Sequence, residues 1–98
     1  MARFDVRRTE DGALYVEAQA GRWADLNTCV VIPLIRPDIA PYAARRMNPS
    51  VFVEGESYVL ATQYMGALPR QALGKSIANL EAQGDSIIEA IDVLLTGF

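Results

Sequence analysis

The end of the chain carries a clear helical pattern, and this pattern limits what the rest can form. Between Asp85 and Phe98 the apolar residues recur at spacings of three and four, which places them along one side of an α-helix. These residues are Ile87, Ile88, Ile91, Leu94, Leu95 and Phe98. Asp85 or Ser86 is a suitable N-cap, and Ser86 followed by Glu89 matches a capping box. Such a helix buries its apolar side only by packing on a second layer.

Short strands separated by turn signals precede the helix. Alternating residues predict strands over 3–8 and 14–20, joined by a hairpin at Asp11-Gly12. The apolar run 29–35 predicts a central strand buried on both faces, in which Pro33 should mark a bulge, an edge or the end. Further expectations are a loop over 21–28, helical turns over 42–47 and 76–83, a hairpin over 51–62 and a weak strand over 65–73.

Many short strands followed by one helix predict a β-rich α+β fold, a small antiparallel sheet or open barrel on which the helix packs. We expect a single domain over residues 1–98, because the sequence has no repeat or linker. Hydrophobic residues make up 51% of this short chain, yet no apolar run could span a bilayer. A homodimer that buries part of this surface is therefore expected.

The residue types for common catalytic and metal sites are missing. The chain has no His and a single cysteine, Cys29, which we interpret as a buried core thiol. Glu54 and Glu56 flank a hairpin glycine and indicate a solvated turn, whereas the pair Arg45-Arg46 suits either an exposed turn or an anion contact. We therefore predict no enzyme activity, no metal and no cofactor. Charges near the N-terminus replace the apolar core of a signal peptide, which favours a cytoplasmic protein.

Charge is distributed unevenly along the chain. The net charge is -3, which disfavours a broad phosphate-binding surface for nucleic acid. All basic residues lie at or before Lys75, and only acidic charges follow it: Glu81, Asp85, Glu89 and Asp92. This acidic segment is either a solvated helix face or a surface for a cationic partner.

Segments spread over the whole chain match one known pattern in order and spacing. They are Arg3-Phe4-Asp5-Val6, Leu14-Tyr15-Val16-Glu17-Ala18-Gln19, Val31-Ile32-Pro33-Leu34, the stretch Asn-Pro-Ser-Val-Phe-Val-Glu-Gly-Glu-Ser-Tyr over 48–58, and Leu94-Leu95-Thr96-Gly97-Phe98. With these segments the chain resembles the CcdB family, the toxins of bacterial toxin-antitoxin modules. The Val-Ile-Pro-Leu strand and the Gly-Glu-Ser-aromatic hairpin are the more specific pieces.

The resemblance implies both a fold and a function. The implied fold is an SH3-like barrel in a homodimer whose C-terminal helices meet near the two-fold axis. The implied toxin traps the complex of DNA gyrase with cleaved DNA by binding the gyrase A subunit, without catalysis of its own. A partly disordered CcdA-like antitoxin would wrap the dimer and neutralise it. No membrane and no direct nucleic-acid partner is implied.

The resemblance also places the gyrase contact at the helix end and in a neighbouring loop. Carried over position by position, the contact residues are Arg22, Trp23, Asp92, Leu95, Thr96, Gly97 and Phe98. The familiar toxins have Ile where this chain has Arg22, Asn where it has Asp92, and Trp where it has Thr96. Asp92 could pair with an arginine of the target directly, and Trp23 could supply an aromatic ring from the loop.

Two other interpretations stay open. The first is a ribonuclease, because related toxins on the same fold cut RNA, although the acidic tail and the lack of His disfavour it. The second is a non-toxic or retargeted homologue that still binds an antitoxin, which is motivated by Thr96 in place of tryptophan.

Overall fold

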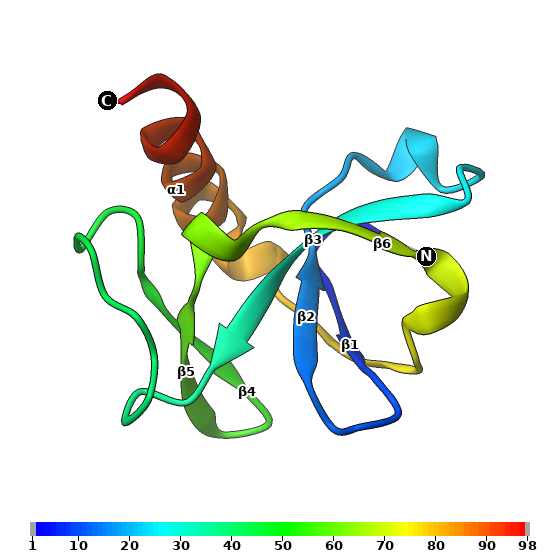
Figure 1. The fold of residues 1–98 in the computed structure, drawn as a ribbon, viewed down its shortest axis with the longest axis horizontal. Helices are drawn as coiled ribbons and strands as arrows, with labels where there is room; N and C mark the ends of the chain where they lie inside the picture. Colours follow the sequence, from blue (N-terminus) through cyan, green and yellow to red (C-terminus); the bar gives the residue numbers. More distant parts are fainter. Residues whose placement is uncertain (1, 98) are drawn as a thin grey trace.

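The computed structural model describes residues 2–97, which form one antiparallel sheet of seven strands followed by an α-helix (Figure 1). The strands are β1 (Asp5–Arg8), β2 (Leu14–Glu17), β3 (Thr28–Ile35), β4 (Ser50–Val53), β5 (Glu56–Leu60), β6 (Gly66–Pro69) and β7 (Ser76–Asn79). The helix α1 runs over Gly84–Thr96. Short 3-10 turns lie in the connections: η1 (Gly21–Trp23), η2 (Thr62–Tyr64), η3 (Arg70–Ala72) and η4 (Glu81–Gln83).

The strands are ordered β4-β5-β3-β2-β1-β7, with β6 beside the first half of β3. The first hairpin turns at Gly12, which has a φ of 90°, as the Asp-Gly signal predicted. The second turns at Glu54 and Gly55, which have φ values of 51° and 83°. The sheet curls into a half-barrel (Figure 1), so the prediction of a small antiparallel sheet with one C-terminal helix is confirmed.

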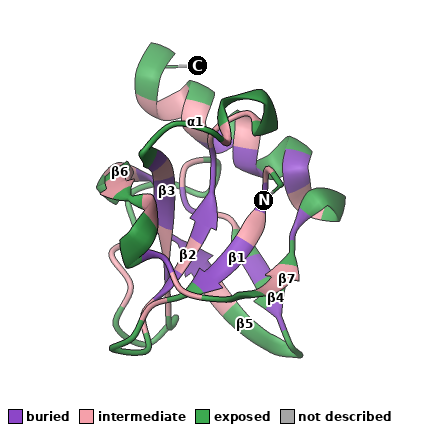
Figure 2. Ribbon diagram, turned by 90° about the vertical axis from the view of Figure 1, so that its right-hand side faces the viewer, coloured by how far each residue is buried: buried purple, intermediate pink, exposed green. Residues whose placement is uncertain are grey.

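Strand β3 is the centre of the sheet and is covered on both faces, as its apolar run predicted. Ile32 and Leu34 belong to the main core, which fills the inside of the curled sheet. Cys29 and Val31 face the other way, into a smaller cluster with Leu73. Figure 2 shows this burial along β3 and the strands next to it.

Pro33 lies inside β3, where it causes no bulge toward β2. The register runs without a break through Leu14 with Leu34, Tyr15 with Pro33, and Val16 with Ile32. On the other edge of β3 the partner changes at this point from β6 to β5, and the Pro33 carbonyl accepts a hydrogen bond of 3.0 Å from the Ala61 N–H. The missing N–H of Pro33 points to that same edge, since a strand residue directs both groups to one side. The changeover therefore accommodates the proline without loss of a ladder bond to β2.

The first half of α1 packs on the core and the second half extends beyond it. Ile87 and Ala90 are completely buried, whereas Leu95 is 67% exposed. In Figure 1 the end of the helix projects past the edge of the sheet. The apolar stripe predicted from the sequence is therefore buried in its first two turns only, and Phe98 lies outside the described residues.

The predicted capping of the helix is wrong. The helix begins at Gly84, and its N-cap, Gln83, makes no side-chain cap hydrogen bond. The Asn79 side chain accepts a hydrogen bond of 2.8 Å from the Glu81 N–H, at the first residue of η4, and η4 leads directly into α1. Asp85 and Ser86 lie within the first helical turn, so neither acts as the cap.

The structure refines four other local predictions. Residues 76–83 form β7 and η4 rather than a helical turn alone, because β1 offers a free edge to pair with β7. The turn expected over 42–47 is a single helical turn at its end, in which the Asn48 N–H donates to the Ala44 carbonyl at 2.8 Å, and the residues before it are irregular. The strand expected over 65–73 ends at Pro69. Residues 21–28 contain a 3-10 turn, η1, within the expected loop.

Among the residues that the structure describes, no helix is long and apolar enough to cross a membrane. The homodimer stays a prediction.

Candidate functional site

Most of the site residues predicted on α1 are exposed at its end. Asp92, Leu95, Thr96 and Gly97 are all exposed, and Leu95 is the large apolar side chain among them. Gly97 ends the helix with a φ of 82°, and its N–H donates to the Val93 carbonyl at 3.0 Å. A residue with this backbone conformation is a common helix terminator, and glycine adopts it at no steric cost.

Thr96 is anchored to its own helix. Its hydroxyl donates a hydrogen bond to the Asp92 carbonyl, one turn earlier. The donor of the Thr96 hydroxyl is thus already engaged, so the side chain offers its methyl group and the acceptor lone pairs of its oxygen to a partner. Phe98, the remaining predicted residue of this end, lies outside the described residues.

Arg22 and Trp23 lie in η1, within the connection between β2 and β3. Trp23 is 48% exposed, and the guanidinium carbon of Arg22 lies 4.8 Å from the centroid of its ring. This is a cation–π contact, which covers one face of the indole with a positive charge. The loop therefore presents an aromatic ring and a cation together.

Side chains from two neighbouring elements hold the backbone of this loop. The Arg70 Nε donates to the Leu26 carbonyl at 2.8 Å, and its Nη2 donates to the Trp23 carbonyl at 3.4 Å. The Gln19 amide donates to the same Trp23 carbonyl at 3.3 Å and to the Thr28 carbonyl at 3.4 Å. The loop has a defined conformation because its carbonyl groups are bonded in this way.

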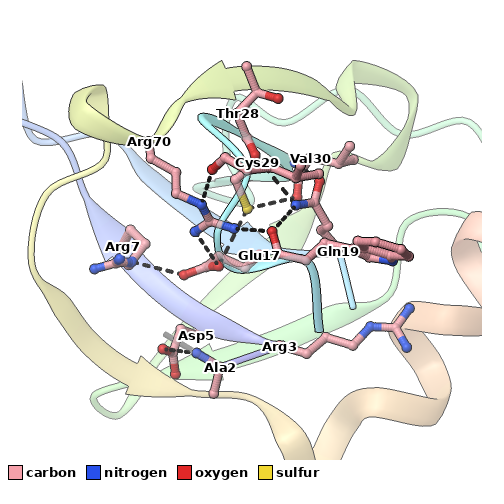
Figure 3. Close-up of polar contacts among 12 residues, drawn as sticks. Ala2, Arg3, Asp5, Arg7, Glu17, Gln19, Thr28, Cys29, Val30 and Arg70 are labelled. Atoms are coloured by element: carbon pink, nitrogen blue, oxygen red, sulfur yellow. Dashed lines mark hydrogen bonds and ion pairs between the residues drawn. The ribbon is translucent and has the colours of Figure 1, made fainter. Parts of the chain in front are cut away.

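Arg70 is in turn part of a buried polar cluster around Glu17 (Figure 3). The Glu17 side chain is 4% exposed and lies 3.0 Å from Arg7 Nε and 3.5 Å from Arg70 Nη1. The Cys29 thiol donates to Glu17 Oε1 at 3.4 Å. Burial, followed by the contact with Glu17, raises the pKa of the Cys29 thiol to about 11. Cys29 is therefore a neutral, buried thiol, as the sequence predicted.

The acidic side of α1 borders a shallow hollow of about 600 Å³. Its lining residues are Arg46, Asp85, Ile88, Glu89, Asp92 and Thr96. Glu89 pairs with Arg46 at 3.1 Å, although both side chains are more than half exposed. Such an exposed pair contributes little to stability. This side of the helix is thus acidic, and Arg46, from the loop between β3 and β4, forms an ion pair with one of its carboxylates.

In Figure 1 the end of α1 and the β2–β3 connection both lie along the upper side of the molecule, the helix end at the left and the connection at the right. The two groups come from distant segments, the β2–β3 connection and the C-terminus, and the width of the sheet separates them in this view. We call the exposed part of these two groups, Arg22, Trp23, Asp92, Leu95 and Thr96, the tip surface. It combines one aromatic ring, one large apolar side chain and charges of both signs, which is typical of a protein-binding surface.

A second hollow, of about 620 Å³, lies near the turn between β1 and β2. Its polar and aromatic lining includes Arg8, Tyr15, Arg36, Tyr58 and Tyr64. Arg36 is paired with Asp38 at 2.7 Å and Arg8 with Glu54 at 3.4 Å. Burial and the neighbouring Glu56 raise the pKa of Tyr58, so this phenol keeps its proton. Within residues 2–97, no group of three or more Asp, Glu or Cys side chains is arranged to hold a metal ion.

The family model for the CcdB protein matches residues 3–97, which is nearly the entire sequence. The chain belongs to the CcdB family. No curated protein matches this CcdB family member in sequence. Among solved structures, the fold is similar to one described as an endoribonuclease from a mycobacterial species, with a TM-score of 0.73 and 19% identity over 97% of this chain and 90% of that chain. At this identity the similarity concerns the fold.

The contribution of Arg70 and Glu17 to this CcdB family member was not evident from its sequence. Glu17 alternates with apolar residues in β2 and looks like a solvent-facing position, yet it is 3% exposed. Arg70 follows Pro69 in a segment with a weak strand signal. The sequence carries no direct signal for this pair. Only the packing of Leu68 and Leu73 in the second cluster shows that this face of the sheet is covered, and a carboxylate buried there needs a charged partner.

Proposed function

We propose that this CcdB family member is the toxin of a toxin-antitoxin module and that it inhibits a target protein by binding it through the tip surface. The match to the family model over residues 3–97 is the observation that carries this proposal. The exposure of Leu95 and Trp23 supports it, because large apolar and aromatic side chains left in solvent are typical anchors of protein interfaces. Binding of this kind needs no catalytic group.

The proposed target is the gyrase A subunit. Thr96 offers no aromatic plane for stacking on an arginine of the target. In the proposed complex, Asp92 pairs directly with such an arginine and Trp23 supplies the aromatic surface from the β2–β3 connection. The acidic hollow beside Asp92 favours a cationic partner segment.

The dimer and the antitoxin complete the proposal. The second half of α1 extends beyond the chain's own core and leaves Ile91 and Leu94 only half-buried, so a second copy would cover these residues while Leu95 stays available to the target. A CcdA-like antitoxin would neutralise the toxin by covering the dimer. Size measurement in solution, with and without such an antitoxin, tests both statements, and a monomer at micromolar concentration would contradict the dimer.

Capture of purified gyrase A subunit tests the target. The wild-type protein should retain the subunit, Trp23→Ala should weaken this binding by about tenfold or more, and Thr96→Trp should strengthen it. Phe52→Ala is the matched control, because Phe52 is 61% exposed on β4, away from the helix end. Binding by Thr96→Trp alone would mean that the wild-type protein has another target.

Uncontrolled expression in bacteria separates a toxin from a harmless homologue. The proposal predicts growth arrest with DNA damage, relieved by the antitoxin and by Trp23→Ala. Normal growth and intact DNA, together with antitoxin binding, would establish the alternative of a non-toxic antitoxin-binding protein.

RNA cleavage is a second candidate, favoured by the hollow that contains Arg8, Arg36 and three tyrosines. Aromatic rings and guanidinium groups are the side chains that stack on bases and pair with phosphates. Incubation of labelled RNA with the purified protein tests this candidate, with Arg36→Ala and Tyr58→Phe as variants. Cleavage that both variants reduce would replace the proposal of a non-enzymatic toxin; intact RNA would exclude this candidate.

A further inference from the structure

The β2–β3 loop, residues 21–28, is attached to the rest of the molecule mainly through its own carbonyl groups. Arg70 reaches two of them: its Nε lies 2.8 Å from the Leu26 oxygen and its Nη2 lies 3.4 Å from the Trp23 oxygen. The backbone N–H of Arg70 donates to a third, that of Asn27, at 2.8 Å. One residue of η3 therefore contacts three positions of the loop.

The same guanidinium reaches the buried carboxylate of Glu17, 3.5 Å from Nη1. The Arg70 side chain is 14% exposed and the Glu17 side chain 4%. Because a buried carboxylate is costly without a partner, this pairing fixes where the guanidinium lies. Arginine has a planar fork of five donors, so one rigid group can bond Glu17 and the loop carbonyls together.

We infer that Arg70, fixed by Glu17, is the positioning residue that holds the β2–β3 loop and thereby presents Trp23 in its binding conformation. The inference rests on the proposed function in so far as Trp23 binds the target. Arg70 itself is directed into the protein and toward the loop backbone, so it acts on the target only through the position of Trp23. A loop that is ordered before binding avoids the entropy cost of ordering it in the complex.

Arg7 provides a matched control for Arg70. It pairs with the same carboxylate, since its Nε lies 3.0 Å from Glu17 Oε2, and it is equally buried, with an 8% exposed side chain. Its Nη1 donates at 2.8 Å to the Gly74 carbonyl, which lies outside the loop. Loss of either arginine therefore disturbs the buried pair, but only loss of Arg70 removes contacts to the loop.

The experiment compares Arg70→Lys with Arg7→Lys. A lysine at 70 keeps the positive charge beside Glu17, but its three donors are on one nitrogen, whereas Arg70 meets Glu17, Leu26 and Trp23 with three separate nitrogens. Trp23 is the only tryptophan, so quenching of its fluorescence by acrylamide reports on the loop directly. Amide exchange of Ala24 and Leu26, whose N–H groups bond Gly21 and Trp23 carbonyls at 3.1 Å, gives a second reading.

Arg70→Lys should increase Trp23 quenching, raise amide exchange at Ala24 and Leu26 about tenfold, and weaken target binding about tenfold. Arg7→Lys should lower the unfolding midpoint while leaving the three readings unchanged. Unchanged loop readings in Arg70→Lys, or equal changes in both variants, would overturn the inference. So would a loosened loop that leaves the affinity of a Trp23-dependent target the same.

Two further measurements keep the inference testable. If Arg70→Lys does not fold, amide exchange in the wild-type protein provides the test. The N–H groups of Ala24, Leu26 and Arg70 should then be protected to a similar degree. Free exchange at Ala24 and Leu26 together with a protected Arg70 would overturn the inference. If the wild-type protein fails to bind gyrase A subunit, the proposed target is wrong, and the quenching and exchange comparisons alone test the role of Arg70.

Discussion

Gly84 lies against the ring of Phe4, and a Cβ on Gly84 would come within 2.8 Å of the Phe4 Cε2 atom. The first residue of α1 is therefore a glycine because the helix begins directly on an aromatic ring of the core. Phe4 is 8% exposed, so the packed core around it limits how far its ring can move aside. The contact fixes how closely α1 approaches the N-terminal segment before β1.

Gly84→Ala should destabilise the protein despite the better helix propensity of alanine. Propensity favours the change by about 0.5–1 kcal/mol, whereas overpacking against a rigid ring costs about 1–3 kcal/mol. The free energy of unfolding in urea should fall by roughly 1–2 kcal/mol. Ser86→Ala, at an exposed position of the same helix turn, should change it by less than about 0.5 kcal/mol. A stabilised Gly84→Ala protein would contradict the tight contact.

Asn48 joins the 36–49 loop to β5, and its loss should be costly. Its side chain is 3% exposed, accepts from the Ala43 N–H at 2.8 Å, and donates to the Leu60 carbonyl at 2.9 Å and to Gln63 Oε1 at 2.6 Å. Asn48→Ala leaves buried partners unsatisfied and should lower the free energy of unfolding by about 1–3 kcal/mol. Gln63→Ala removes one of these bonds only and should cost less. Equal losses would argue against the bonds to Ala43 and Leu60.

Leu95 and Ile87 should behave in opposite ways although both belong to the apolar stripe of α1. Leu95 is 67% exposed, so Leu95→Ala should change stability by less than about 0.5 kcal/mol yet weaken target or antitoxin binding. Ile87 is completely buried, and Ile87→Ala should cost about 2–5 kcal/mol of stability. Thermal unfolding and binding titration of both variants check this, and a loss of stability in a monomeric Leu95→Ala protein would refute it.

The buried thiol of Cys29 should make stability fall at alkaline pH. Its pKa is about 11 in the folded protein and near 9 when exposed, so between these values the unfolded chain has lost the proton that the folded chain keeps. The thiol therefore favours the folded state fully below pH 9, and this contribution is lost as the pH rises through 11. Wild-type stability should fall faster than that of Cys29→Ala over this range, as urea unfolding at several pH values can measure. Parallel curves would show that the thiol is not desolvated.

The fold could be predicted from local patterns where each element carries its own signal. Gly12 and Gly55 mark both hairpins, and the apolar run of β3 marks the central strand. Patterns failed where a neighbour decided the outcome. Residues 76–79 form β7 because β1 has an open edge, and α1 begins at Gly84 because η4 leads directly into it.

The tip surface could be predicted only in part. The resemblance to the CcdB family names Trp23, Asp92, Leu95 and Thr96 as contact residues; all four are exposed, and their role in binding stays a prediction. It carried no information on how the loop is held, because the bonds of Arg70 to Trp23, Leu26 and Glu17 join positions up to 53 residues apart. Contacts of such separation leave no periodic pattern in the sequence.

The sequence by itself determined the hairpins, the central strand, the amphipathic helix and the family, because these depend on residue order and short-range spacing. Only the tertiary structure decided which half of the helix is buried, why Gly84 begins it and which carboxylate is hidden. Glu17 and Glu89 have the same chemistry, yet one lies between two arginines under the second cluster and the other lies in solvent beside Arg46. Burial is set by the packing of distant segments, and it is burial that gives identical side chains different roles.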